Sequence, residues 1–201
     1  SSFEPPLFCN IQMYERNQFY TLTEISTVES FLHISSTLKS AVAFQCIAYI
    51  IDRFTVLELE NASLFYLLLS TLHIFEKKIC SPSFASSYFS LQFLKEAGFA
   101  LNFSKCQNCG KAFTGKTFSF SQWKNALFCE DCTKKNHIFP SFKIDLKEQL
   151  ERIYYCSLNN IEKSQFGYLL FDYSEIERII KELFKGFLAS DCLTVSQFEN
   201  Y

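Results

Sequence analysis

The sequence predicts an α+β chain that is mainly α-helical, with a short β-domain first and a helical domain after it. Glycine and proline are scarce, at 5 and 4 of 201 residues, which favours helices over a many-turned β-sandwich. Hydrophobic residues make up 48%, enough to bury a core. Two Cys-x-x-Cys pairs, Cys106/Cys109 and Cys129/Cys132, interrupt the helical part and predict an inserted zinc module.

The first 33 residues contain the β-domain. Residues 7–14 alternate in polarity, and residues 19–25 are rich in aromatic and β-branched side chains. The polar stretch 15–18 lies between them, so the pattern predicts a β-hairpin. A lone hairpin is marginal in water and the sequence begins without Met, so we expect further strands upstream.

Two apolar helices are expected next. Helical periodicity begins near Ser35 or Ser36, either of which is a suitable N-cap, and continues to about Arg53. A second helix is expected from about Asn61 to Lys78. Both apolar runs are shorter than the roughly 18 residues of a membrane span, so they predict buried helices and no membrane association.

Three more helices follow. One is expected over residues 83–97, where Gly98 is placed to end it. Asp145 is a candidate cap for another, which should reach about residue 158.

The last predicted helix opens on a capping box formed by Ser174 and Glu177 and ends near residue 189. The helical domain therefore spans residues 34–201, with the zinc insertion at 104–136.

The cysteine spacing indicates a structural zinc site. Each Cys-x-x-Cys pair offers two thiolates from one tight turn, and 19 residues separate the pairs. Four sulfur ligands close a tetrahedron around Zn²⁺ and leave no position for a catalytic water. His137 follows Cys132 closely and is a competing ligand, but four cysteines already fill the shell. The remaining cysteines stand alone and are typical of buried thiols in a reducing cytosol: Cys9, Cys46, Cys80, Cys156 and Cys192.

A phosphate-loop pattern is also present and is expected to be misleading. Residues 110–117 match G-x-x-x-x-G-K-[ST] letter for letter. That loop must follow a buried strand and open a helix, and neither is evident here. No paired carboxylates or nucleophile–base grouping are recognisable elsewhere, so we expect no enzyme.

Positive charge is concentrated around the cysteines. Residues 105–147 hold eight lysines and three acidic residues, whereas the parts on either side are acidic. The net charge of the whole chain is -2. Lysines interleaved with aromatic rings are typical of nucleic-acid binding, but rings also form the core of a small zinc module, and we favour the latter for most rings. The candidate DNA-binding residues are Lys105, Lys111, Lys116, Lys124, Lys134, Lys135 and, on the hairpin, Arg16.

Residues 93–110 resemble the passage of the RecO family that leads from a helix into its first Cys-x-x-Cys-Gly. Residues 118–120 and the second cysteine pair resemble the part that follows. The hairpin resembles the end of the family's OB-fold. The chain departs from the family pattern where it lacks a proline near residues 102–104 and a Gly-Gly before the second pair.

The resemblance implies a remnant of an N-terminal OB-fold β-barrel, with the four cysteines as metal ligands. It also implies a bacterial, cytoplasmic (nucleoid) mediator of DNA repair and recombination. Such a protein binds single- and double-stranded DNA, preferring single strands, and anneals complementary strands. Its implied partners are RecR and single-stranded-DNA-binding protein, with which it helps to load RecA. The alternative is a zinc-braced helical module that binds proteins without direct DNA contact.

Overall fold

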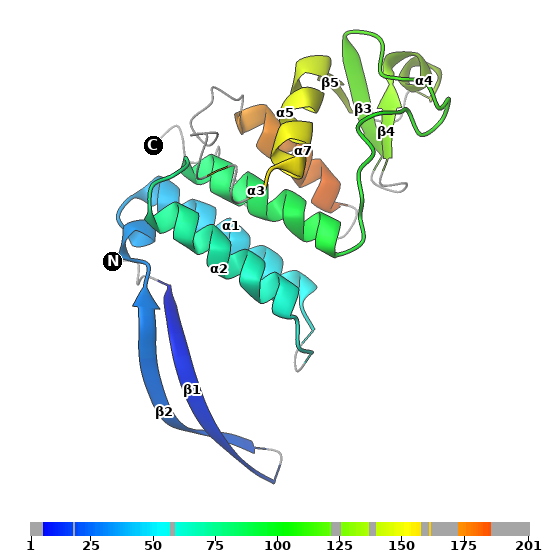
Figure 1. Cartoon of the computed structure of the whole chain (residues 1–201). Helices are drawn as coiled ribbons and strands as arrows, with labels where there is room; N and C mark the ends of the chain where they lie inside the picture. The colour runs from blue at the N-terminus through cyan, green and yellow to red at the C-terminus, as the bar shows by residue number, and fades with distance from the viewer. Residues whose placement is uncertain are drawn as a thin grey trace.

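The structure, a computed structural model, describes residues 6–17, 19–56, 59–121, 126–136, 140–157, 161 and 173–185. Its helices and strands, shown in Figure 1, are β1 (Leu7–Arg16), β2 (Phe19–Ser30), the 3-10 helix η1 (Leu32–Ser35), α1 (Leu38–Phe54), α2 (Ala62–Glu76), α3 (Pro82–Glu96), β3 (Thr117–Ser121), β4 (Ala126–Cys129), α4 (Glu130–Asn136), β5 (Ser141–Lys143), α5 (Ile144–Tyr155) and α7 (Tyr173–Lys185). None of the helices in these ranges has the length and apolarity of a transmembrane span.

Helix α3 is the centre of the helical domain. It packs against α1 and α2 on one side and against α5 and α7 on the other (Figure 1). Its side chains are buried on nearly every face, including serines such as Ser86 and Ser90, whose small size lets neighbouring helices approach. Ser90 Oγ donates to the Ser86 carbonyl at 2.7 Å, so this buried hydroxyl has its hydrogen-bond partner within the same helix. The more apolar α2, expected to be buried, instead exposes Phe65 and Tyr66.

The N-cap of α1 differs from the prediction. Thr37 Oγ1 accepts the backbone N–H of Ser40 at 3.1 Å, so Thr37 is the cap. Ser35 and Ser36, the predicted caps, instead donate their hydroxyls to carbonyls of the preceding 3-10 turn. That turn places the helix start later than periodicity alone predicts.

The next two helices agree with the sequence. Asn61 caps α2 by accepting the N–H of Leu64 at 3.0 Å. Ser81 caps α3, which begins one residue earlier than predicted. Gly98 ends α3 with φ +85°, a left-handed conformation that glycine adopts without steric cost.

The predicted caps of the later helices are wrong. The N-cap of α5 is Lys143, which makes no side-chain capping bond, and Asp145 lies inside the first turn, where its charge still favours the helix dipole. Helix α5 ends at Tyr155, short of the predicted boundary. Ser174 lies within α7 rather than before it. The predicted end near residue 189 lies outside the described residues.

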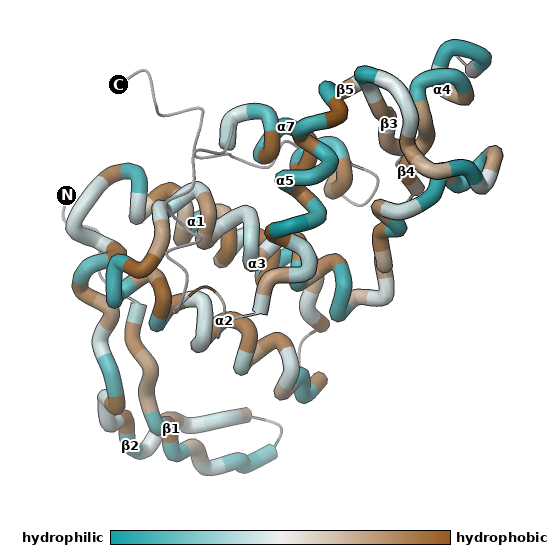
Figure 2. The backbone as a smooth tube through the Cα atoms, turned by 45° about the horizontal axis from the view of Figure 1, so that its top comes forward, coloured by the Kyte–Doolittle hydropathy of each residue, from teal (hydrophilic) through white to brown (hydrophobic). Residues whose placement is uncertain are grey.

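The predicted hairpin is confirmed and is longer than expected. Strands β1 and β2 pair antiparallel, with two register shifts at which β2 has one extra residue, Val28 and Thr23. The pairs Ile11–Ile25 and Met13–Leu22 give the hairpin one apolar face, and all four of these side chains are more than 50% exposed. The hairpin projects away from the helices (Figure 1), and its brown apolar segments are visible in Figure 2.

The root of the hairpin is tied to α2. His73 Nε2 lies 2.8 Å from Glu29 Oε2, and the His73 ring packs edge-on against buried Phe31. The backbone N–H of His33 donates to Glu76 at 2.8 Å. His73 is therefore partnered, but its half-exposed side chain lies at the hairpin junction rather than in the core.

Candidate metal centre and basic surface

A three-stranded sheet of order β4-β3-β5 carries the cysteine region, and residues 104–121, 126–136 and 140–143 are called the cysteine module below. Phe118 and Phe120 of β3 and Phe142 of β5 are at most 2% exposed and belong to the helical core. Phe128 packs with the cysteines on the second face. The rings in the described part of the module thus serve packing, as favoured from the sequence, while Trp123 lies outside that part.

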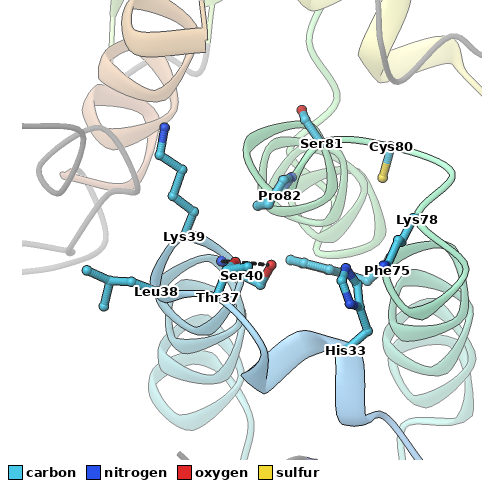
Figure 3. A pocket seen from close by; sticks show the side chains of 10 residues that line it. All are labelled: His33, Thr37, Leu38, Lys39, Ser40, Phe75, Lys78, Cys80, Ser81 and Pro82. Carbon is cyan, nitrogen blue, oxygen red and sulfur yellow. Dashed lines mark hydrogen bonds between the residues drawn. The ribbon is translucent and has the colours of Figure 1, made fainter.

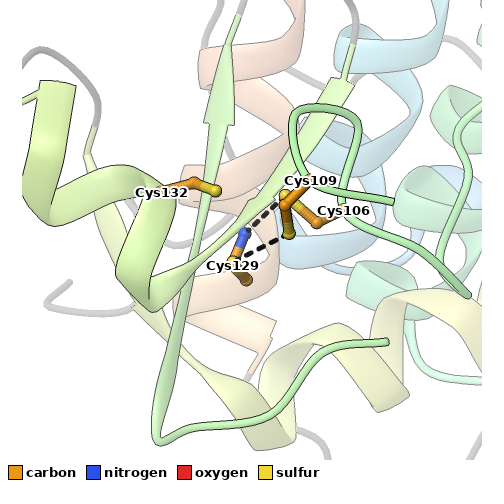
Figure 4. A group of neighbouring side chains, drawn as sticks. All are labelled: Cys106, Cys109, Cys129 and Cys132. Carbon is orange, nitrogen blue, oxygen red and sulfur yellow. Dashed lines mark hydrogen bonds between the residues drawn. The ribbon is translucent and has the colours of Figure 1, made fainter. Parts of the chain in front are cut away.

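The structure brings the four predicted sulfur ligands together (Figure 4). The first pair lies on the turn from Cys106 to Gly110, where Gly110 has φ +69° and its N–H bonds the Cys106 carbonyl at 2.9 Å. Cys129 ends β4, and Cys132 lies in the first turn of α4 directly after it. All four sulfur atoms lie within 4.8 Å of one another.

The arrangement fits a tetrahedral metal ion. Four sulfurs at about 2.3 Å from a zinc ion are about 3.8 Å apart, and the sulfurs of Cys109 and Cys129 are 3.8 Å apart. Cys106, Cys129 and Cys132 are buried and Cys109 is exposed. An all-sulfur, four-ligand set suits zinc best among common structural ions. Among the described residues, no other group of His, Cys, Asp or Glu has this proximity.

The surrounding N–H groups favour negative charge on one sulfur of the cluster, that of Cys106. Burial raises the pKa of Cys106, but N–H groups of Cys129, Cys109 and Asn108 outweigh it and lower that pKa to about 6. The Cys129 N–H lies 3.3 Å from this sulfur, and the Asn108 side-chain amide donates to Cys132 at 3.4 Å. Burial and the neighbouring thiols raise the pKa of Cys129 to about 12. A cation binding here would bring the remaining thiols to the thiolate form.

Glu130 connects the loop after the first pair to the second pair. Its Oε2 accepts the Lys116 N–H at 2.8 Å, and its Oε1 lies 2.7 Å from Lys134 Nζ. The hydrogen bond from Lys134 and that from the Lys116 N–H lower the pKa of Glu130 to about 2. Gly115 has φ +129°, and a Cβ there would lie 2.8 Å from Glu130 Oε2.

The same contact separates residues 110–117 from a phosphate-binding loop. The amide of Lys116, which a bound phosphate would need, already holds a carboxylate of the protein. Strand β3 begins at Thr117, where a phosphate loop would open a helix.

The predicted DNA-binding lysines that the structure describes are exposed on the cysteine module. Two of them, Lys134 and Lys135, lie in the last turn of α4, which Figure 2 shows as hydrophilic. Arg16 lies at the far tip of the hairpin, away from the module (Figure 1). Lys124 and His137 lie outside the described residues. The exposed set is Lys105, Lys111, Lys116, Lys134 and Lys135.

Lys147 has a structural role that sequence reasoning missed. Only 12% of its side chain is exposed; Nζ donates to the Phe103 carbonyl at 3.2 Å and to Glu151 at 3.0 Å. Nζ also lies over the Phe113 ring at 5.5 Å. The i,i+4 spacing of Lys147 and Glu151 on a helix is the sequence feature that could have predicted their ion pair. This lysine braces α5 against the module and is not part of the exposed basic surface.

The fold and the cysteine cluster define a class of protein: a helical domain with an inserted four-cysteine module. The family model described as "Recombination protein O C terminal" matches residues 35–167. The chain belongs to the RecO family.

Individual relatives agree with that assignment. "DNA repair protein RecO" of Caldicellulosiruptor bescii is 28% identical over 161 residues, which cover 80% of this chain and 64% of that protein. "DNA repair protein RecO" of Dehalococcoides mccartyi is 30% identical over 129 residues, covering 63% of this chain and 50% of that protein. The chain thus spans between half and about two thirds of these relatives.

Proposed function

We propose that the chain is a non-catalytic mediator of DNA repair and recombination. It binds DNA, preferentially single strands, and anneals complementary strands in the bacterial cytoplasm, at the nucleoid. RecR and single-stranded-DNA-binding protein are its partners in loading RecA. The observation that carries the proposal is an exposed lysine surface on the cysteine module of a RecO-family chain.

The four cysteines hold a structural Zn²⁺ in this account. The ion neutralises part of the thiolate charge and cross-links the first turn to β4 and α4. Because four sulfurs complete the coordination, the ion has no role in chemistry on a substrate. Its function is to hold the lysine-bearing loop and α4 in one fixed arrangement.

The lysines contact DNA phosphates rather than bases. Phe118 and Phe120 are buried, so they are not stacking platforms for unpaired bases. Ammonium groups neutralise phosphates without reading sequence. This is the recognition mode that a protein acting on any single strand requires.

The hairpin adds a second surface, as the last part of an OB-fold. Tyr14 and Tyr20 are 62% and 58% exposed near its tip, beside Arg16. Tyr14 pairs with Thr21 and Tyr20 with Glu15, so the two rings point to opposite faces. A strand lying on one face therefore stacks on only one of these rings.

Charge reversal tests the proposal. The binding of labelled single-stranded DNA should weaken steeply with salt, with a logarithmic slope of about -0.7 per phosphate contact. Replacing Lys111, Lys116 and Lys135 by Glu should lower affinity and reduce that slope by roughly 2. Lys95→Glu, at the exposed end of α3, is the control and should change little. Unaltered DNA binding by the triple variant would show that the cysteine module does not contact DNA.

A protein-interaction module is the second candidate function. The apolar hairpin face and the exposed Phe65 and Tyr66 of α2 favour it, because such patches are typical of docking surfaces. Retention of RecR or of single-stranded-DNA-binding protein by a chain that binds no DNA would select this alternative.

A further inference from the structure

The four residues of the cysteine cluster differ in their access to solvent. Cys106, Cys129 and Cys132 are 1%, 5% and 7% exposed, whereas Cys109, on the turn that ends at Gly110, is exposed. The four lie around one centre (Figure 4), so a reagent in solution that approaches this centre meets Cys109 first. The cluster is therefore buried on three of its members and open at the fourth.

The hydrogen bonds to the four sulfurs divide them in the same way. The Cys129 N–H donates to the Cys106 sulfur at 3.3 Å, and the Asn108 side-chain amide donates to the Cys132 sulfur at 3.4 Å. The Cys132 N–H donates to the Cys129 sulfur. Among the described residues, no N–H group donates to the sulfur of Cys109, whose contacts include the Cys129 sulfur at 3.8 Å. An N–H donor stabilises a thiolate and lowers its nucleophilicity, so Cys109 is the most nucleophilic sulfur of the four.

Cys80 illustrates the opposite situation. It lines a pocket formed where α1 and α3 begin and α2 ends (Figure 3), but it is only 5% exposed. Burial raises the pKa of its thiol to about 12, so this thiol stays protonated and unreactive near pH 7. Cys46 and Cys156 are buried in the same helical core. These three thiols are internal references for a reaction that requires an accessible thiolate.

We propose that Cys109 is the site at which oxidants and electrophiles attack the cluster, and that its modification releases the zinc ion. The proposal rests on the zinc site proposed above and does not depend on DNA binding. It assigns a modification site, because susceptibility of a cysteine to oxidation follows thiolate character and exposure. Both properties meet at Cys109, and each of the other three ligands lacks the exposure.

Hydrogen peroxide is the oxidant for which the steps are written. The Cys109 thiolate attacks one oxygen of the peroxide, the O–O bond breaks, a sulfenic acid forms and hydroxide leaves. The Cys129 thiolate, 3.8 Å away, then attacks the sulfenic sulfur, an S–S bond forms and a second hydroxide leaves. The two sulfurs lose two electrons, which the peroxide accepts.

The disulfide removes two of the four thiolate ligands, and the remaining pair is too few to hold the ion in a structural site. The ion therefore leaves, and the link from the first turn through Cys132 to α4 is lost with it. Oxidation thus loosens the surface that carries the module lysines. A thiol reductant reverses the step, because a disulfide is on the reversible part of cysteine oxidation.

Two measurements on the zinc-loaded full chain test the proposal. In the first, limiting N-ethylmaleimide is followed by peptide mass mapping, and the label should appear on Cys109 before the other three ligands and before Cys80, with zinc released in step. In the second, hydrogen peroxide is added with a chromogenic zinc indicator. Zinc should be released, and mapping should find Cys109 in a disulfide with Cys129.

Two matched variants separate reactivity from ligand loss. Cys109→His and Cys132→His both keep four ligands, because histidine also binds zinc in structural sites. Peroxide should release zinc from Cys109→His about tenfold more slowly than from the wild type, the factor that one charge-assisted hydrogen bond represents. Cys132→His retains the reactive sulfur and its partner, so it should release zinc at about the wild-type rate.

Three results would overturn the proposal: a label on another ligand ahead of Cys109, a peroxide-induced disulfide that omits Cys109, and wild-type release of zinc by Cys109→His. If that variant binds no zinc, the labelling order in the wild type decides alone. A wild-type chain that takes up no zinc would instead refute the proposed zinc site. The labelling order of the metal-free chain then decides the reactive sulfur: Cys109 first supports its assignment, and any other order refutes it.

Discussion

The backbone N–H of Lys116 donates to Oε2 of Glu130 across 2.8 Å and so joins the loop after the first cysteine pair to α4, the helix that carries Cys132 of the second pair. Glu130 follows Cys129 directly, and the bond therefore holds two segments that share the four-cysteine cluster. We therefore expect metal binding to order the loop around Lys116, and the ordered loop to strengthen metal binding, through the Glu130 carboxylate.

Glu130→Gln is expected to weaken metal binding. The amide side chain keeps the shape but loses the charge that attracts Lys134 and the Lys116 N–H. Supporting contacts around metal sites typically contribute tenfold or more in affinity, so a loss of about tenfold is expected in competition with a chelator. Asp131→Asn removes the same charge one residue away and is the control; equal losses in both variants would contradict a specific role for Glu130.

Gly115→Ala should destabilise the cysteine module. Its φ of +129° is a glycine conformation, and the added Cβ would lie 2.8 Å from Glu130 Oε2. Strain of this kind costs about 1–3 kcal/mol before the clash is counted. Gly98→Ala is the matched control, since Gly98 also has positive φ but no atom lies within 4 Å of its added Cβ. The melting temperature of Gly115→Ala should therefore be lower than that of Gly98→Ala, and the reverse order would refute the contact with Glu130.

Removing the metal should unfold the module. Zinc binding contributes about 10–16 kcal/mol in small zinc domains, comparable to the whole stability of a typical domain. Cys129→Ser and chelation should both lower the melting temperature sharply, while Cys9→Ser on the hairpin should not. One zinc per chain by elemental analysis is expected for the wild type. A metal-free wild type with unchanged melting would be incompatible with this account.

Thr37→Ala should cost about 1 kcal/mol of unfolding free energy, the usual value of a lost N-cap. The Thr37 hydroxyl accepts the N–H of Ser40, whereas Ser35 only donates to a carbonyl of the preceding turn. Ser35→Ala should therefore cost much less in the same chemical denaturation experiment. A larger loss of unfolding free energy for Ser35→Ala than for Thr37→Ala would mean that Ser35, the position that periodicity predicts, is the N-cap.

Features encoded within a few residues could be predicted from the sequence. The proximity of the four cysteines follows from spacing within two turns, and the end of α3 follows from Gly98. The start of α2 near Asn61 is equally local, because the Asn61 side chain caps it.

Features that depend on distant contacts could not be predicted. Strand β5 has only three residues and exists because Phe142 packs into a core built by other segments. Helix α4 begins between the two cysteines of one pair, where the spacing predicts only a turn. The burial of α3 exceeds what its serine-rich sequence indicates, because neighbouring helices cover it on both sides. The tie between Lys116 and Glu130 spans 14 residues and leaves no periodic signal.

Hydrogen exchange with and without bound single-stranded DNA tests most directly whether the cysteine module is the DNA-binding surface. If the module binds DNA, exchange should slow on binding in residues 105–116 and in α4, with no change in α2. The slowing should disappear when Lys111, Lys116 and Lys135 are replaced by Glu. Protection confined to the hairpin or to α2, with the cysteine module unaffected, would contradict DNA binding by the module.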